Sequence, residues 1–291
     1  MIIWLASYPK SGNTWLRSIL VQLLFNEKGI ANNSNVLKDI SKISSYPQKK
    51  YFERLSNFSN KDFNNKEVIM KNWIDTQNNI NQKPGIKIFK THNYACKLYD
   101  ANGNGFSFTN LENSIGVIYI VRDPRNIITS IKNHFSMESY EEAFNMMENK
   151  DTWLVGDREG RIPEAMSSWD NHYLSWSRFP KNFHLVKYEN LLFQTELEIK
   201  KLKNYLNSFY EINENEINIE EIVKSTNFKS LKKNEEEYGF EESVSDKNTG
   251  NKVPFFNLGP KNDWRNLLTE KITKKIEERF GQIMQKLGYL N

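Results

Sequence analysis

The sequence predicts an α/β fold with a central parallel β-sheet flanked by helices. Short apolar runs of strand length alternate with segments in which apolar residues recur at helical spacing, which is typical of this fold class. Their length suits strands that are buried within a sheet. The four runs are residues 2–6, 86–89, 115–121 and 183–186. Ligands of such sheets bind outside the carboxyl ends of the strands, so the residues that follow each run are candidate site residues.

The composition is that of a globular protein. The chain has 291 residues, 38% hydrophobic and 26% charged, enough to bury a sizeable core, and we expect a single domain over residues 1–291. The single cysteine, Cys96, excludes a disulfide framework and indicates a reducing, cytoplasmic location. No apolar run approaches the about 18 residues of a membrane span, and no secretory leader is recognisable. A net charge of +4 does not favour nucleic acid as a partner.

Two segments lack strong periodicity. Residues 32–85, rich in Asn, Lys and Ser, are expected to form irregular helices and loops. Residues 232–260 begin with a charged run and contain the turn signal Asn248-Thr249-Gly250, so we expect a long loop, either a lid or a solvated surface loop. We expect both to be variable segments on the acceptor side or in a lid.

The first apolar run is followed by a tight loop and the start of a helix. Residues 8–15 read YPKSGNTW, and apolar residues then recur at helical spacing from Trp15 to Leu24. A helix start offers unpaired N–H groups and a positive dipole end, Gly12 permits close approach of a ligand, and Lys10 adds a charge. The loop therefore predicts a phosphate or sulfate site, although a solvated Lys10 beside an ordinary cap also explains it.

The order of residues in this loop argues against an ordinary ATP-binding loop. A GxxxxGKS or GxxxxGKT pattern requires lysine directly after the second glycine. Here Lys10 precedes Gly12. A kinase or ATPase of the usual kind is therefore disfavoured.

Two further run ends carry reactive side chains. The run 115–121 leads into Arg122, with Asp123 placed as a helix N-cap and Ser130 about two turns into that helix, so that a guanidinium and a hydroxyl can converge on one anion. Arg122 could instead pair with an acidic side chain. The run 86–89 leads into Lys90 and His92, and an imidazole there can act as a general base near neutral pH. Taken alone, His92 is better explained as a structural histidine, and it is the two flanking motifs that favour a general base.

Together these motifs resemble those of sulfotransferases that use 3′-phosphoadenosine 5′-phosphosulfate (PAPS). Residues 8–15 are similar to the 5′-phosphosulfate loop YPKSGTTW and depart from it at Asn13. Residues 121–135 are similar to the 3′-phosphate motif, and residues 90–92 match the KTH sequence that supplies the base. The resemblance covers essentially the whole chain and implies a P-loop-like nucleotide-binding fold with about five strands in the central sheet.

The resemblance also implies roles for individual residues. Lys10 would contact the phosphosulfate, Lys90 would steady the transferring group, and His92 would accept a proton from the acceptor. Residues 11–14 would surround the 5′-phosphate. Tyr188 lies in a sequence similar to YEDL, and residues 225–234 are similar to TSFxxMKxN. Trp15 and Phe228 would flank adenine, and Thr226 would form a hydrogen bond in the adenine region. The residues implied to bind PAPS or its product adenosine 3′,5′-bisphosphate (PAP) are Lys10, Ser11, Gly12, Asn13, Thr14, Trp15, Arg122, Ser130, Tyr188, Thr226, Phe228 and Gly259. No motif requires a metal, and none is expected.

The last motif departs from the pattern. Residues 257–264 align with RKGxxGDW, but Asn257 and Leu258 replace the Arg and Lys that hold the 3′-phosphate. Either Lys252 or Lys261 substitutes, or the 3′-phosphate is held more loosely. The dimerisation motif KxxxTVxxxE is not preserved either, so no dimer is inferred and the oligomeric state stays open.

The function that the resemblance implies is transfer of a sulfuryl group from PAPS to a hydroxyl or amine of a small-molecule acceptor, with His92 as the general base. The sequence does not identify the acceptor. Two alternatives stay open, a nucleotide or metabolite kinase of related fold and a nucleotide-binding protein without catalysis.

Overall fold

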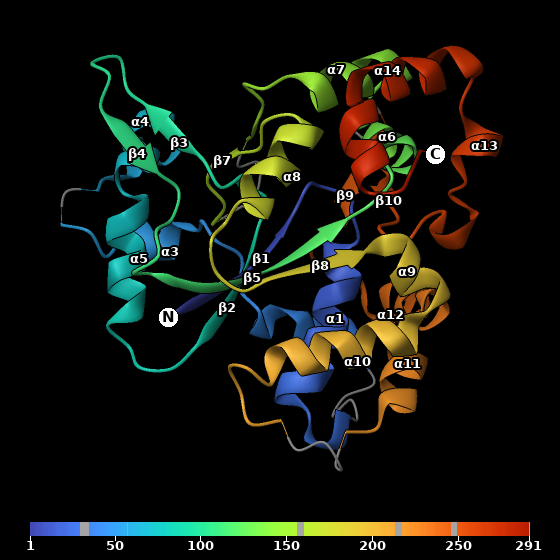
Figure 1. Ribbon diagram of the computed structural model, residues 1–291, viewed down its shortest axis with the longest axis horizontal. Helices are drawn as coiled ribbons and strands as arrows, with labels where there is room; N and C mark the ends of the chain where they lie inside the picture. The colour runs from blue at the N-terminus through green and yellow to red at the C-terminus, as the bar shows by residue number, and fades with distance from the viewer. Residues whose placement is uncertain (30–34, 57, 156–159, 213–216, 246–248, 291) are drawn as a thin grey trace. The chain divides into compact units, whose positions relative to one another are not determined.

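A four-stranded sheet forms the centre of the fold, with the strand order β2-β1-β5-β8 (Figure 1). The computed structural model describes residues 1–291 except 30–34, 57, 156–159, 213–216, 246–248 and 291. The strands are β1 (Ile2–Ser7), β2 (Lys87–Thr91), β5 (Ser114–Val121) and β8 (Phe183–Lys187). Each corresponds to one of the four apolar runs. The prediction of a central parallel sheet flanked by helices is confirmed.

The size of the sheet differs from expectation. About five strands were expected from the resemblance, whereas the described residues contribute four to this sheet. The remaining strands of the described chain are two or three residues long and pair locally as β3–β4, β6–β7 and β9–β10. The chain offers four apolar runs long enough to be buried on both faces, and each of them is used.

The register of β1 and β2 aligns the ends of these two strands. The pair is parallel, with Ala6 opposite Thr91. Ser7, the last residue of β1, and His92, which directly follows β2, therefore lie at the same edge of the sheet. This places the candidate base at a carboxyl end, as predicted.

Two helices form where the sequence predicts them, α1 (Asn13–Phe25) and α6 (Pro124–His134). A third long helix, α14 (Glu270–Lys286), has apolar residues at the same helical spacing. Asp123 is the N-cap of α6, because its side chain accepts a hydrogen bond from the N–H of Arg125, and proline occupies the first helical position. These caps are local in sequence, which explains why they were predictable.

The other elements are on average shorter than these helices. Among the described residues of the segment 32–85, the short α-helices α2 to α5 are separated by turns and loops, which confirms the expectation of irregular helices and loops. The α-helices are α2 (Val36–Asp39), α3 (Lys49–Phe52), α4 (Lys66–Lys71), α5 (Trp73–Asn81), α7 (Tyr140–Glu148), α8 (Trp169–Ser177), α9 (Tyr188–Phe193), α10 (Thr195–Leu206), α11 (Ile219–Thr226), α12 (Phe228–Tyr238) and α13 (Trp264–Leu267). Four 3₁₀ turns are η1 (Glu27–Gly29), η2 (Ile40–Lys42), η3 (Asn60–Asn64) and η4 (Gly259–Lys261). The short strands are β3 (Lys97–Tyr99), β4 (Gly105–Ser107), β6 (Trp153–Leu154), β7 (Glu164–Ala165), β9 (Val244–Ser245) and β10 (Lys252–Val253).

The expectation of a loop throughout residues 232–260 is wrong at its beginning. Residues 232–238 belong to α12. Asn227 caps this helix by accepting from the N–H of Ser230, and Leu231 is buried. Lys233, Glu236 and Glu237 of the charged run lie on the solvent side of an amphipathic helix, for which Lys and Glu have good propensity. Glu235 of the same run is buried and accepts from the backbone N–H groups of Phe255 and Phe256. Residues 246–248 of this segment lie outside the described residues.

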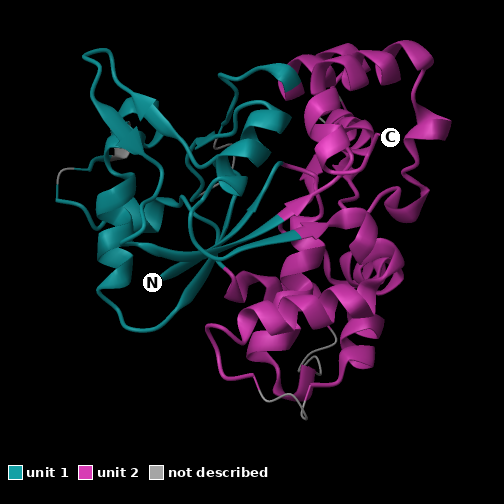
Figure 2. Ribbon diagram, viewed as in Figure 1, with its two compact units in different colours: residues 1–8, 44–119, 148–185 teal, residues 9–43, 120–147, 186–291 magenta. Residues whose placement is uncertain are grey.

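The chain divides into two compact units (Figure 2). Unit 1 comprises residues 1–8, 44–119 and 148–185, and unit 2 comprises residues 9–43, 120–147 and 186–291. Each unit is built from three separate stretches of sequence. Among the described residues, no helix has the length and apolar character to cross a membrane.

Candidate donor site and candidate base

The loop between β1 and α1 has the backbone of an anion-binding turn. Lys10 has a φ of 66° and Gly12 a φ of 104°, both in the left-handed region, which costs a residue other than glycine about 1–3 kcal/mol. Gly12 is the N-cap of α1, and no side chain caps the helix. The first N–H groups of α1 thus keep their donor capacity at the positive end of the helix dipole. This arrangement suits a phosphate or sulfate group.

The Tyr188 ring joins the first motif to the second. A Cβ on Gly12 would lie 2.6 Å from Tyr188 Cδ2, so the loop has no room for a side chain there. The ring meets Trp15 edge-on, with centroids 5.6 Å apart, and the guanidinium of Arg122 stacks 4.0 Å from its centroid. Four of the residues predicted to bind the donor are therefore in mutual contact through one ring.

Several buried polar atoms of the predicted donor-binding residues have no hydrogen-bond partner within the described part of the chain. They include Ser11 Oγ, Trp15 Nε1 and Arg122 Nε. Buried polar groups nearly always have a partner in the protein, in water or in a ligand. The one hydrogen bond of Arg122 among the described residues is long, 3.4 Å from Nη1 to the carbonyl oxygen of Lys10. The remaining N–H donors of Arg122 fit an anionic ligand.

The segment after α12 contacts the same loop. The ammonium of Lys10 lies 4.2 Å from the centroid of the Phe255 ring. Thr14 donates its hydroxyl hydrogen to Glu242 Oε2 at 3.0 Å, and Arg17 pairs with Glu242 Oε1 at 2.6 Å. A ligand that takes the Thr14 hydroxyl as donor must therefore compete with the Glu242 carboxylate.

Two aromatic residues predicted to flank adenine share one apolar cluster. Trp15 and Phe228 both pack against the buried side chains of Val36, Leu37, Ile40, Leu231 and Phe256. Gly259 lies directly against the Phe228 ring, which a Cβ would overlap, so this glycine allows the chain to pass the aromatic ring closely. The structure thus brings Trp15, Phe228 and Gly259 into one region of unit 2.

Among the residues predicted to bind the donor, Thr226 is the least available to a ligand. Its side chain is fully buried, and its hydroxyl donates to the carbonyl oxygen of Ile222 at 2.6 Å. This bond, a common one for threonine in a helix, uses the single hydroxyl hydrogen. A role for Thr226 at the adenine stays a prediction and would be limited to accepting a hydrogen bond.

Ser130 is approached by an amide rather than by a cation. Asn262 donates from Nδ2 to Ser130 Oγ at 3.0 Å and to the carbonyl oxygen of Asn126 at 2.9 Å. The side chains of Lys252 and Lys261, the two predicted substitutes for the missing cations, are exposed.

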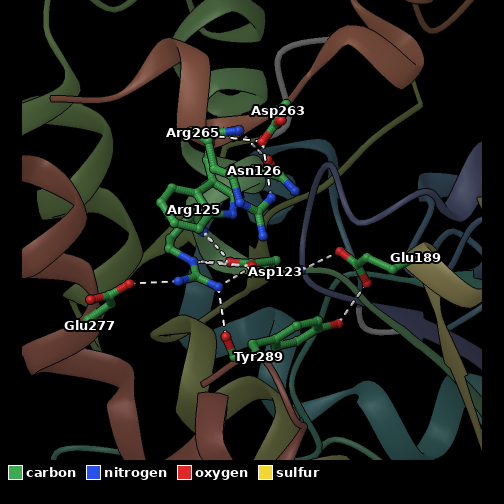
Figure 3. A network of polar contacts seen from close by, with 9 residues as sticks. Asp123, Arg125, Asn126, Glu189, Asp263, Arg265, Glu277 and Tyr289 are labelled. Atoms are coloured by element: carbon green, nitrogen blue, oxygen red, sulfur yellow. Dashed lines mark hydrogen bonds and ion pairs between the residues drawn. The ribbon is translucent and has the colours of Figure 1, made fainter. Parts of the chain in front are cut away.

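Arg125 is committed to the protein and is not free for a ligand (Figure 3). Its guanidinium donates to both carboxylate oxygens of Asp123, to Glu277 Oε1 at 2.6 Å and to the carbonyl oxygen of Tyr289 at 2.8 Å. Glu189 accepts from the backbone N–H of Asp123 and from the hydroxyl of Tyr289, each at 2.9 Å. Burial raises the pKa of Glu189. This network anchors the turn between Arg122 and α6 to α9 and α14.

The orientation of His92 in unit 1 suits a general base. Its Nδ1 lies 2.7 Å from the carbonyl oxygen of Ser7. Because a carbonyl oxygen only accepts, Nδ1 carries the proton and Nε2 carries the lone pair. Burial, with a further contribution from the positive charge of Lys90, holds the pKa of His92 well below 6.5. The imidazole is therefore neutral at physiological pH and able to accept a proton.

Glu164, in β7, connects the two candidate catalytic residues of unit 1. Its Oε1 accepts from the backbone N–H of His92 at 3.1 Å, and its Oε2 lies 3.8 Å from the ammonium of Lys90. The Lys90 and Glu164 side chains are largely buried. One carboxylate thus holds the backbone of the base and faces the lysine.

His172, in α8, holds the other side of the His92 backbone. Its Nε2 lies 3.1 Å from the carbonyl oxygen of His92, and its Nδ1 lies 2.9 Å from Tyr119 Oη. The carbonyl requires Nε2 to be the donor, so Nδ1 accepts from the tyrosine hydroxyl. Complete burial lowers the pKa of His172 to about 3. His172 is a neutral structural histidine.

Sequence reasoning missed Glu164, Asn262 and Ser7. Glu164 and Asn262 are 72 and 132 positions from their partners, and no local pattern marks them. The one available signal was at residues 257–264, where Asn262 occupies the place of a glycine in the resembled motif. Ser7 acts through its backbone carbonyl, which any residue would supply.

Comparison with known proteins adds family membership to this geometry. A family model described as the sulfotransferase domain matches residues 2–288. The chain is 26% identical to sulfotransferase 1E1 of Rattus norvegicus, over 96% of this chain and 82% of the relative, and 25% identical to flavonol 3-sulfotransferase of Flaveria bidentis, over 96% and 81%. The crystal structure of mouse sulfotransferase SULT7A1 complexed with PAP matches with a TM-score of 0.58 and 21% identity, over 97% of this chain and 83% of that one. Because the family model spans nearly the whole chain, the protein belongs to the sulfotransferase domain family, which confirms the predicted family and sulfotransferase function.

Proposed function

We propose that this sulfotransferase takes its sulfuryl group from PAPS, releases PAP, and uses His92 to accept the proton of the acceptor hydroxyl or amine. The observation that carries the donor assignment is the clustering of Gly12, Trp15 and Arg122 around the Tyr188 ring. Structures of SULT7A1 and of retinol dehydratase that match this fold were solved with PAP, which supports the same nucleotide here.

The residues present fit a nucleotide with phosphates at two positions. All the proposed donor-binding residues belong to unit 2. The uncapped start of α1 and the buried Ser11 hydroxyl suit the 5′-phosphosulfate, and Arg122 with its uncommitted Nε suits the 3′-phosphate. Trp15 and Phe228 offer aromatic surface to adenine.

The proposed chemistry divides among three side chains and the backbone N–H groups at the start of α1. PAPS supplies the sulfuryl group, whose bond to the 5′-phosphate oxygen breaks as a bond to the acceptor oxygen or nitrogen forms. His92 accepts the acceptor's proton at Nε2. Lys10 and the N–H groups of α1 stabilise the charge that develops on the departing phosphate, and Lys90 stabilises the transferring group. Positioning and charge stabilisation are the main contributions of a protein to such transfers.

We further propose a small-molecule acceptor and a cytoplasmic location. The named relatives include flavonol 3-sulfotransferase, whose acceptor is a small molecule by its name. One cysteine in 291 residues is consistent with a reducing compartment.

Calorimetric titration tests the donor assignment. Purified protein is titrated at one salt concentration with PAP, with ADP, and with ATP plus Mg²⁺. We expect PAP to bind most tightly, because it alone carries a 3′-phosphate. Equal affinity for the three nucleotides would contradict the assignment and favour a kinase or a non-catalytic nucleotide-binding protein. Release of PAP from PAPS on addition of phenolic, alcoholic and amine acceptors then tests transfer itself.

A further inference from the structure

The segment that lacks the Arg–Lys pair brings a buried amide to α6. Asn262 is 7% exposed and lies between η4 and α13. Two hydrogen bonds from this stretch end on Asn126: Asn262 Nδ2 donates to its carbonyl oxygen, and the backbone N–H of Trp264 donates to its Oδ1 at 2.9 Å. The segment is therefore fastened to the first turn of α6, one turn before Ser130.

The orientation of the Asn262 amide is determined by its partners. Asn126 O can only accept, so the group 2.9 Å from it must be the NH₂ of Asn262. The second hydrogen of that NH₂ is directed to Ser130 Oγ at 3.0 Å. A flipped amide would set an oxygen against a carbonyl oxygen. Asn262 consequently acts as a donor to the Ser130 hydroxyl.

The Ser130 hydroxyl keeps its own hydrogen for donation. In an α-helix a serine hydroxyl commonly donates to the carbonyl three or four residues earlier, here Ile127 O or Asn126 O. Asn126 O already receives the Asn262 amide and, within the helix, the Ser130 N–H. Among the described residues, the one hydrogen bond of Ser130 Oγ is the one that it accepts from Asn262. The hydroxyl hydrogen of Ser130 is then available to an acceptor outside the helix.

We propose that Asn262 is a positioning residue that makes Ser130 a hydrogen-bond donor to the 3′-phosphate of the sulfuryl donor. The inference rests on the proposed function, because the 3′-phosphate belongs to the proposed nucleotide. It assigns the 3′-phosphate recognition, lost where Asn257 and Leu258 replace Arg and Lys, to a neutral amide–hydroxyl relay. Lys252 and Lys261, which are exposed, have no part in it.

The test compares two nucleotides that differ in the 3′-phosphate. Affinities for PAP and for adenosine 5′-monophosphate (AMP) are measured by calorimetry for the unaltered protein and for Asn262→Ala. The matched control is Asn266→Ala, an exposed asparagine four positions later. We expect Asn262→Ala to weaken PAP binding by about tenfold, the range of a hydrogen bond to a charged group, while AMP affinity is unchanged. Asn266→Ala should change neither affinity.

A double-mutant comparison separates positioning from direct binding. In a Ser130→Ala background, Asn262→Ala should change the ratio of PAP affinity to AMP affinity by less than about twofold, because the hydroxyl through which Asn262 acts has already been removed. A full additional loss in that background would overturn the proposal, as would an unchanged ratio in the single variant. If Asn262→Ala fails to bind AMP, Asn262→Ser replaces it, and equal weakening of PAP and AMP would show a structural role only.

The unaltered protein distinguishes this inference from the proposed function. If it binds PAP no better than AMP, there is no 3′-phosphate recognition and the donor assignment fails together with the relay. If it prefers PAP and Asn262→Ala keeps that preference, only the relay fails.

Discussion

The Nδ1–H of His92 is donated to the carbonyl oxygen of Ser7, at 2.7 Å. Ser7 is the last residue of β1 and precedes Lys10 by three positions. The ring of the proposed base is thus oriented by the backbone of the strand that leads into the proposed phosphosulfate loop. The tautomer of His92 is set by a backbone carbonyl, so it does not depend on the identity of the Ser7 side chain.

Replacing His92 should separate catalysis from donor binding. We expect His92→Ala to lower kcat by about 10²–10⁴-fold, the usual contribution of a general base, while PAP affinity is retained because no proposed donor ligand is removed. Steady-state kinetics and calorimetry on the same preparation check this. Near-normal turnover would exclude His92 as the base.

The pH dependence of the reaction should reflect the depressed pKa of His92. The base works in its neutral form, and burial together with the charge of Lys90 holds its pKa well below 6.5. We therefore expect kcat/KM to stay level as the pH is lowered from 7.5 through 6.5 and to fall only at more acidic pH. A profile that loses half its value near pH 6.5 would indicate an unperturbed histidine and contradict the buried environment.

Two substitutions of Glu164 should differ in their effect on kcat. Glu164→Gln keeps an acceptor for the His92 N–H and removes the charge near Lys90, whereas Glu164→Ala removes both. Loss of a hydrogen bond with a charged acceptor costs about 1.5–3 kcal/mol, so we expect kcat to fall at least about tenfold in the alanine variant and less in the glutamine variant. The KM for PAPS should change little. Equal activity of both variants with the unaltered protein would show that Glu164 does not position the base.

His172 should make folding stability depend on pH. Its pKa is about 3 in the folded protein, against about 6.5 when unfolded. The unfolded state thus binds one more proton between these values, and the free energy of unfolding falls by up to about 1.4 kcal/mol per pH unit as the pH drops below 6.5. Urea unfolding between pH 6.5 and 5 should show a shallower slope for His172→Gln, which retains a donor for the His92 carbonyl. Parallel slopes would contradict this assignment.

The native carboxylate of Glu242 should oppose donor binding. It accepts the hydrogen bond of the Thr14 hydroxyl, which is predicted to contact the 5′-phosphate. Charge-assisted hydrogen bonds are about twice as strong as neutral ones, so Glu242→Gln should release Thr14 more easily and also remove a negative charge near an anionic ligand. We expect tighter PAP binding and a lower Tm, since Arg17 loses its ion pair. Weaker binding would mean that Glu242 preorganises the loop instead of competing for it.

The parts of the fold that the sequence predicted depend on local signals. The four central strands coincide with apolar runs, and α6 begins at the cap that Asp123 and Pro124 mark. The sequence prediction is wrong at the start of residues 232–260, because a charged run is also typical of a loop. Asn227 provides a helix cap for this segment and Leu231 a buried side chain. Helix propensity and this one buried side chain make the segment helical.

The sequence by itself determined the fold class, the family and the order of the motifs along the chain, since strand runs, caps and loop motifs are encoded within a few neighbouring residues. The tertiary structure decided which atoms those motifs can use. It set the tautomer of His92 through Ser7, committed Arg125 to Glu277 and Tyr289, and brought Asn262 to Ser130 across 132 positions. The physical reason is that a hydrogen bond requires its two atoms within about 3 Å, and for residues far apart in sequence only the packed fold provides that distance.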